Sequence, residues 1–289
     1  MLKKVCLTQQ FHNDQRCVML LGGFDGLHVG HKQLVARAKT FGLPVGIMTI
    51  SHGKNENGLF TVEERESIFR AAGIDFVFEL PFAEIKELSP AEFIALLERE
   101  CSPQAFVCGD DFRFGKNAVG NAQNLKTTAQ VCVEIVNLVH IDGKKASSTT
   151  IKTCLKDGDI VSANRILGEP FFLLGEVIKD RGVGKTIGFP TANIIYPADK
   201  FSIKQGVYET QVELGGKRYC AITNYGARPT FDNERVLTET YIDGFDGDLY
   251  GQTLKVEFIR YLRDNQKFPT VEQLKNQLQE DIRRVRNHD

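Results

Sequence analysis

The chain has 289 residues, enough for two domains at about 150 residues each. Its 42% hydrophobic and 25% charged residues exclude a disordered or fibrous protein, and its formal net charge of −1 gives no general attraction to nucleic acid or anionic lipid. Seven cysteines, an odd number without a CxxC pair, exclude a disulfide framework and a thiolate zinc site and favour the reducing cytoplasm.

The first 168 residues alternate short apolar runs with amphipathic segments, a pattern typical of a parallel sheet with crossover helices. Thr61 with Glu64, and Ser89 with Pro90, are start signals for two of the helices. We expect strands over 17–21, 45–50, 76–80, 105–108 and 133–139, and helices over 31–41, 61–72, 89–100, 149–156 and 160–167. Residues 1–168 are therefore predicted to form a doubly wound α/β domain.

Residues 169–289 have a different pattern. Between 171 and 263, β-branched and aromatic residues are interrupted by Gly, Pro and Asn, and residues 206–214 and 254–259 alternate with period two. We predict a small antiparallel β-barrel, followed by a C-terminal helix over 270–286. No apolar run approaches the roughly 18 residues of a membrane span, and the first ten residues do not resemble a signal peptide.

The most specific local pattern is the segment 22–31, Gly-Gly-Phe-Asp-Gly-Leu-His-Val-Gly-His, between a predicted strand and a predicted helix. Such a turn lets backbone N–H groups and a helix N-terminus approach phosphate. His28 and His31 flank Gly30, so imidazoles there can stabilise charge on a departing pyrophosphate. The alternatives are a zinc half-site, which lacks further ligands at suitable spacing, or two ordinary surface histidines.

The His28-Val29-Gly30-His31 motif resembles the HxGH signature of the nucleotidyltransferase superfamily. Further motifs follow in order along the chain, at 109–115, 147–152, 184–193, 224–230, Glu239 and 248–251. Together they resemble the prokaryotic bifunctional riboflavin kinase/FMN adenylyltransferase (FAD synthetase) family. The resemblance implies that the C-terminal barrel phosphorylates riboflavin to FMN and that the N-terminal nucleotidyltransferase domain converts FMN to FAD, both with ATP and Mg²⁺.

The resemblance also implies site residues. In the N-terminal domain, His28 and His31 are catalytic, and the residues that bind ATP or phosphate are Gly23, Phe24, Asp25, Gly109, Asp111, Phe112, Ser147, Ser148, Thr149 and Lys152. In the C-terminal domain, Glu239 is the catalytic base, Thr191 and Asn193 bind the metal, Gly184 and Lys185 bind phosphate, and Arg228, Pro229 and Thr230 bind flavin. Taken alone, the Ser147 segment could be a plain helix cap, and Glu239 an exposed strand carboxylate.

A P-loop is a weaker interpretation of Gly184-Lys185-Thr186. The first glycine of that motif would fall at Lys179, and Ile-Gly-Phe-Pro follows where a helix is required. A flexible flap over phosphates is favoured, with a simple hairpin turn as the alternative.

Most departures from the family pattern lie in the N-terminal domain. Gly23 stands where Asn is common, the loop after Thr49 is short and lacks prolines, and Lys152 replaces an arginine whose planar fork suits phosphate. In the barrel, Tyr241 stands where His is frequent. Three functions therefore stay open: a bifunctional FAD synthetase, mainly a riboflavin kinase, or a non-catalytic flavin or nucleotide sensor. The oligomeric state is not indicated by the sequence.

Overall fold

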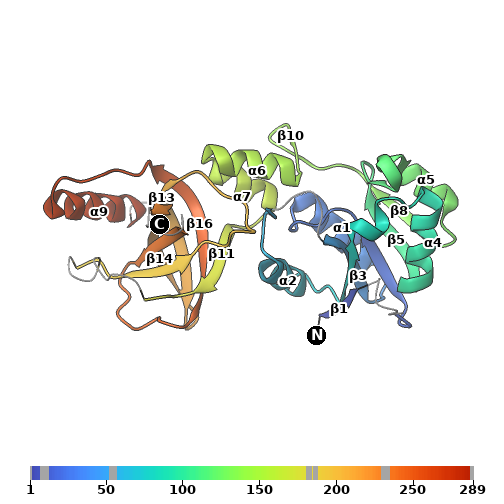
Figure 1. The fold of residues 1–289 in the computed structure, drawn as a ribbon, viewed down its shortest axis with the longest axis horizontal. Coiled ribbons are helices and arrows are strands. Elements are labelled where there is room, and N and C mark those ends of the chain that lie inside the picture. The colour runs from blue at the N-terminus through green and yellow to red at the C-terminus, as the bar shows by residue number, and fades with distance from the viewer. Residues whose placement is uncertain are drawn as a thin grey trace. The chain divides into compact units, whose positions relative to one another are not determined.

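The computed structural model describes residues 2–6, 13–51, 57–179, 184, 188–228 and 235–286. Contacts divide the chain into two compact units, Met1–Thr150 and Ile151–Asp289, whose elements are labelled in Figure 1. Each unit is built around its own sheet, one parallel and one antiparallel.

A six-stranded sheet forms the centre of the first unit, and every neighbouring pair of its strands is parallel. In spatial order the strands are β1 (Lys3–Cys6), β4 (Phe76–Pro81), β3 (Val45–Ser51), β2 (Cys17–Leu21), β5 (Pro103–Gly109) and β8 (Cys132–Val136). From β2 the chain proceeds to β3 and β4 on one side and later to β5 and β8 on the other. This reversal is the mark of a doubly wound sheet and confirms the predicted fold class, although strand β1 was not predicted.

Helices and two short hairpins complete this unit. The helices are α1 (Val29–Lys39), α2 (Val62–Ala71), α3 (Phe82–Ile85), α4 (Pro90–Cys101) and α5 (Ala122–Thr128). The hairpins are β6 (Arg113–Phe114) with β7 (Gly120–Asn121), which enclose the 3₁₀ turn η1 (Lys116–Ala118), and β9 (His140–Ile141) with β10 (Lys144–Lys145). As predicted, Thr61 and Ser89 cap α2 and α4, each in a reciprocal capping box.

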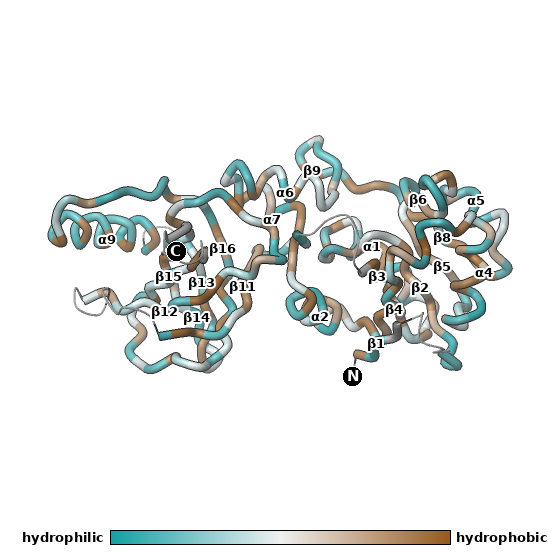
Figure 2. Tube along the Cα trace, in the orientation of Figure 1, coloured by the Kyte–Doolittle hydropathy of each residue, from teal (hydrophilic) through white to brown (hydrophobic). Residues whose placement is uncertain are grey.

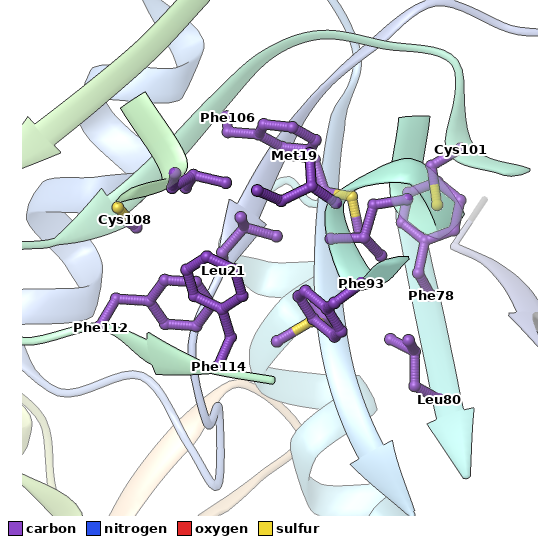
Figure 3. Close-up of a cluster of buried hydrophobic side chains, with 14 of the residues drawn as sticks. Met19, Leu21, Phe78, Leu80, Phe93, Cys101, Phe106, Cys108, Phe112 and Phe114 are labelled. Carbon is purple, nitrogen blue, oxygen red and sulfur yellow. The ribbon is translucent and has the colours of Figure 1, made fainter. Parts of the chain in front are cut away.

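The core of the first unit has two sides, because successive strand residues point to opposite faces of the sheet. On one face, Met19 and Leu21 pack with Phe78 of β4 and Phe93 of α4 (Figure 3). The intervening Leu20 is fully buried on the other face, which α1 covers through its contacts with β2, β3 and β5. The central strands are accordingly mainly hydrophobic (Figure 2).

The second unit is a curled antiparallel sheet. Its strands, in spatial order, are β11 (Phe171–Glu176), β16 (Thr253–Arg263), β13 (Gly206–Leu214), β14 (Lys217–Arg228), β15 (Arg235–Ile242) and β12 (Thr191–Ile195). The sheet curls until its two edges meet, where the Ile178 N–H donates to the Asn193 carbonyl over 2.8 Å. The predicted small antiparallel barrel is thus confirmed.

Three further helices belong to the second unit for most of their length: α6 (Ser148–Asp157), α7 (Ile160–Leu167) and α9 (Val271–Arg286). The predicted boundary after Gly168 assigns α6 and α7 to the first unit, whereas their hydrogen bonds are made with the barrel. Asn164 of α7 donates to the Phe258 carbonyl and accepts from the Phe171 N–H, each over 2.8 Å, and the Leu155 carbonyl of α6 accepts from the Lys204 N–H over 3.0 Å. These bonds explain why the division by contacts falls after Thr150, whereas the change in composition falls after Gly168.

Candidate active sites

A cavity of about 810 Å³ opens at the carboxyl ends of β2 and β5 in the first unit. This is the point where the strand order reverses, and the connections after the two strands diverge there to leave a crevice. Eight residues predicted to act in the N-terminal domain line the cavity: Gly23, His28, His31, Gly109, Asp111, Phe112, Ser147 and Ser148. The fold therefore brings together motifs more than a hundred residues apart in the sequence.

His28 and His31 lie at the start of α1 with their rings stacked, 3.6 Å between centroids and 17° between planes. His28 is the N-cap residue, because its Nδ1 accepts a hydrogen bond from the His31 backbone N–H over 3.2 Å. A methyl group on Gly30 would lie 3.1 Å from the His28 ring, so the absence of a side chain at this position permits the cap. The HxGH spacing is thus explained by packing as well as by chemistry.

The hydrogen bonds assign the protons of both rings. Since His28 Nδ1 is an acceptor, the neutral ring carries its proton on Nε2, where it is a donor. His31 Nδ1 lies 2.9 Å from the Gly26 carbonyl, which can only accept, so the neutral ring has its lone pair on Nε2. Burial lowers the pKa of His28 to about 3 and that of His31 to about 4, and both rings are neutral at pH 7 without a ligand.

Charged and hydroxyl groups also line the cavity. Lys145 Nζ donates to Asp111 Oδ2. Ser147 Oγ accepts from the Thr150 N–H over 3.2 Å at the start of α6, so Ser147 is a helix cap that also lines the cavity. A methyl group on Gly109 would lie 2.8 Å from Asp111 Oδ1, so a glycine here makes room for that carboxylate.

Four predicted residues do not line the cavity. The Phe24 ring is buried 4.5 Å from the His31 ring and supports it. Asp25 Oδ1 accepts from the Leu59 N–H over 2.8 Å and anchors the start of the segment that leads to α2. Thr149 is exposed, and Lys152 Nζ lies 5.6 Å from the Phe201 ring centroid in the second unit. Phe24 and Asp25 thus support neighbouring parts of the unit, and their roles in binding ATP or phosphate stay predictions.

Sequence reasoning missed two parts of this site. Lys145 carried no motif signal, although the short spacing before Ser147 could have suggested it. The apolar end of the cavity was missed as well, and it is lined by Met48, Ile50, Phe82, Ile85 and Phe93 together with the predicted Phe112. These side chains come from β3, α3 and α4, and only the packing of the unit brings them together.

The second candidate site is on the barrel, where neighbouring strands place polar residues side by side. Asn193 of β12 is the Cα partner of Glu239 on β15, and Glu239 is the partner of Asn224 on β14. Thr191 lies two residues from Asn193 on the same face, and its Oγ1 donates to Asn193 Oδ1 over 3.3 Å. The structure therefore brings together the three residues predicted as metal ligands and base.

These residues lie on the outer face of the sheet. The adjacent Thr223 and Thr240 are fully buried and hydrogen-bonded through their hydroxyls over 2.9 Å, so they point into the barrel. Because side chains alternate along a strand, Asn224 and Glu239 point outward. The candidate site therefore lies on the outer face of the barrel, whose interior is filled by packed side chains.

Gly184 lies beside this cluster. Its carbonyl accepts from the Phe189 N–H over 2.8 Å, and a methyl group added to it would lie 2.3 Å from the Phe189 carbonyl oxygen and 3.4 Å from Thr191 Oγ1. The predicted Lys185, Pro229 and Thr230 lie outside the described residues. Arg228 ends β14, and its side chain also lies outside the described set.

Comparison with known proteins assigns each half of the chain to a family. Residues 10–150 match the family model of FAD synthetase, and residues 167–288 match that of riboflavin kinase. The bifunctional riboflavin kinase/FMN adenylyltransferases of Bacillus subtilis and Escherichia coli are each 31% identical to this chain. The matches cover 97% and 95% of this chain and 96% and 95% of those proteins. The chain belongs to this bifunctional family.

A solved structure extends the comparison. A crystal structure described as a macrolide-efflux protein from Streptococcus pneumoniae has a TM-score of 0.89 and 30% sequence identity, and the match covers 98% of this chain and 99% of that one. This chain and that protein thus share their fold over nearly their whole length. Within the described residues, no helix is long and apolar enough to cross a membrane.

Proposed function

We propose that this chain catalyses two successive ATP-dependent reactions, each in its own unit. The second unit transfers the γ-phosphoryl group of ATP to riboflavin, giving FMN and ADP, and the first transfers AMP from a second ATP to FMN, giving FAD and pyrophosphate. The observation that carries this proposal is the presence of two separate polar clusters, the stacked histidines at α1 and the Thr191, Asn193 and Glu239 group on the barrel. The cysteine pattern supports the cytoplasm as the place of both reactions.

The cavity of the first unit suits adenylyl transfer. Its volume of about 810 Å³ is within the range of roughly 300–1,000 Å³ that small-molecule sites have, and its apolar end suits a flavin ring while its polar end suits phosphates. An FMN phosphate oxygen forms the new bond to the α-phosphorus of ATP as the bond to pyrophosphate breaks. No protein nucleophile and no proton transfer are needed, so catalysis rests on positioning and charge stabilisation.

Three side chains and the N-terminus of α1 stabilise that charge. His28 donates from Nε2 to a phosphate oxygen while its Nδ1 keeps α1 capped. His31 becomes a second donor when the triphosphate, by its negative charge, favours protonation of Nε2. Lys145, which also lines the cavity, adds a positive charge, and the positive end of the α1 helix dipole favours the same anion.

The barrel site suits phosphoryl transfer to an alcohol. Glu239 orients the ribityl 5′-hydroxyl group of riboflavin and accepts its proton as the oxygen bonds to the γ-phosphorus. Asn193, directly beside Glu239, and Thr191 hold the nucleotide end of the reaction. Gly184 lets the backbone approach Thr191 closely enough to cover the phosphates.

Mg²⁺ fits the donor set of the barrel site. This ion prefers oxygen ligands and usually keeps few protein contacts, taking the rest from phosphates and water. The Thr191 hydroxyl and the Asn193 carboxamide offer two such oxygens 3.3 Å apart, and in the described part of the chain no group of three acidic, His or Cys side chains forms an all-protein cage. Bound there, Mg²⁺ would neutralise charge on the transferring phosphoryl group.

One experiment separates the candidate functions. The purified protein is incubated with riboflavin, ATP and Mg²⁺, and the flavins are separated by chromatography. Accumulation of FAD supports the bifunctional enzyme, whereas accumulation that stops at FMN supports a riboflavin kinase with an altered first unit. Unchanged riboflavin with measurable ligand binding would overturn the proposal in favour of a sensor.

A further inference from the structure

Helix α9 packs on the face of the barrel that carries the candidate kinase residues. Ile282 and Val285 of α9 form one apolar cluster with Val207 of β13 and Ile222 of β14. Phe189 and Tyr241 pack against the same cluster from the two segments that carry Thr191 and Glu239. The C-terminal helix thus shares one apolar cluster with both segments of the site, and most of its residues are hydrophilic (Figure 2).

Tyr241 connects the parts of this site. It is the Cα partner of Thr191 on one neighbouring strand, and it lies two residues from Glu239 on the same face. Its ring contacts the Phe189 ring edge-on, with 5.3 Å between the ring centroids. The Phe189 N–H in turn donates a hydrogen bond to the Gly184 carbonyl. A shift of Tyr241 would therefore move the strand that carries the base relative to the segment that carries the metal ligands.

A bidentate ion pair fixes the strand end next to Tyr241. Arg286 lies in the last turn of α9. Its Nε donates to Asp243 Oδ2 over 2.7 Å and its Nη2 donates to Asp243 Oδ1 over 2.8 Å. Asp243 directly follows β15, and its N–H donates to the Cys220 carbonyl over 2.9 Å. Burial raises the pKa of Tyr241, and Asp243 and Arg286 act on it in opposite directions, which places both charges near the phenol.

A second ion pair holds α9 without Arg286. Asp281 is fully buried and accepts three hydrogen bonds from Arg263 of β16, at 3.0 and 2.7 Å to Oδ2 and at 3.2 Å to Oδ1. Gln277 also donates to Asp281 Oδ1, over 2.9 Å. Loss of the Arg286 pair should therefore leave the helix docked and free only its last turn.

We propose that the Arg286–Asp243 pair positions Glu239 for riboflavin phosphorylation, acting through Tyr241. Arg286 and Asp243 are positioning residues: neither lies in the Thr191, Asn193 and Glu239 cluster, and their effect passes along β15. The inference rests on the proposed kinase function of the second unit. It assigns the C-terminal helix a part in the reaction in addition to covering the barrel.

The test uses charge reversal in the full-length protein. Arg286→Asp and Asp243→Arg should each lower kcat for FMN formation about tenfold, because a small displacement of a reacting group is costly. The double variant restores the ion pair with reversed polarity and should recover most of the rate. FMN adenylylation by the same preparations is the internal control and should not change.

A matched variant controls for charge alone. Arg283 lies on the same helix and pairs with Glu280 of α9, so Arg283→Asp makes the same change in charge without touching β15. It should keep full kinase activity. The unfolding midpoint of Arg286→Asp should change little, because the Arg286 side chain is largely exposed and ion pairs of exposed side chains contribute little to stability. Arg286→Gln gives a milder variant if the reversal impairs folding.

The outcomes are distinct. If the wild-type protein phosphorylates riboflavin and both Arg286→Asp and Asp243→Arg keep full kinase activity, the inference is overturned and the proposed function stands. Equal losses in Arg283→Asp and Arg286→Asp, or no recovery in the double variant, would also overturn it. A wild-type protein that leaves riboflavin unchanged would instead overturn the proposed function and, with it, the inference.

Discussion

The two candidate sites differ in how the chain builds them. In the first unit, loops and a helix N-terminus meet at the end of a parallel sheet, and hydrogen bonds between backbone and side chains hold the groups in place. In the second, the side chains stand on neighbouring strands, and the antiparallel register alone aligns Asn193, Glu239 and Asn224. We call the first the loop site and the second the register site. The loop site can be altered by local changes, whereas the register site depends on the whole barrel face.

The largest expected effect is on the register site. Glu239→Gln keeps the size of the side chain but removes the proton acceptor, so riboflavin phosphorylation should fall by about 10² to 10⁴-fold. Adenylylation of supplied FMN should be unchanged, because it takes place in the other unit. Chromatographic assays of FMN and FAD formation measure both steps, and a near-normal kinase rate would remove Glu239 from its role as base.

The loop site offers a comparison of two substitutions at one residue. His28→Ala removes both the cap and the Nε2–H donor, whereas His28→Asn keeps a side-chain acceptor for the cap and removes only the donor. Both should lower FAD formation by about 10² to 10³-fold. Only the alanine variant should also lose about 1 kcal/mol of unfolding free energy.

Unfolding in urea and assays of FAD formation check this pair. Riboflavin phosphorylation in the same samples is the control and should stay at the wild-type level. If His28→Asn forms FAD at the wild-type rate, His28 is a helix cap without a catalytic role.

The histidines also make the first unit sensitive to acid. Their pKa values of about 3 and about 4 when folded lie below the ordinary 6.5, so below about pH 6.5 the unfolded chain binds protons that the folded chain does not. The free energy of unfolding should therefore fall as the pH drops from about 6.5 towards 4, by up to about 1.4 kcal/mol for each pKa unit of a fully shifted group. Urea titrations at several pH values measure the slope, which should be shallower in His28→Asn; equal slopes would contradict the burial of this ring.

The smallest effect is expected at Gly23, where the family commonly has Asn. A methyl group there would meet no atom within 4 Å, so Gly23→Asn should change the unfolding free energy by less than about 0.5 kcal/mol. If the glycine at this position lowers the adenylyltransferase activity of the first unit, Gly23→Asn should raise the rate of FAD formation and leave the rate of FMN formation unchanged. A lower rate of FAD formation would show that the open space at Gly23 is needed for the substrate.

Much of both folds could be predicted from the sequence. The starts of α2 and α4 followed from the Thr61 and Ser89 capping patterns, because capping depends on residues three positions apart. Strands β2 and β13 matched their predicted ranges, since their apolar runs and alternation are local. Strand β1 and helix α5 carried too weak a pattern, and neighbouring elements determine their conformation.

The candidate sites were predictable to different extents. The contiguous His28 to His31 motif indicated a candidate phosphate site next to a helix, and His28 caps the start of α1. The contacts of Phe24 with His31 and of Asp25 with Leu59, and the presence of Lys145 and Phe82 at the cavity, could not be inferred, because they are set by the tertiary packing of the unit.

The sequence by itself determined the order of elements, the change from parallel to antiparallel architecture and the residue types available for chemistry. These features depend on local periodicity, turn residues and short spacings. The tertiary structure alone decided that Glu239 points away from the barrel interior, that α6 and α7 are hydrogen-bonded to the second unit, and that α9 packs on the face of the candidate kinase residues. Strand register and packing set those relations, and both depend on contacts that no stretch of sequence contains on its own.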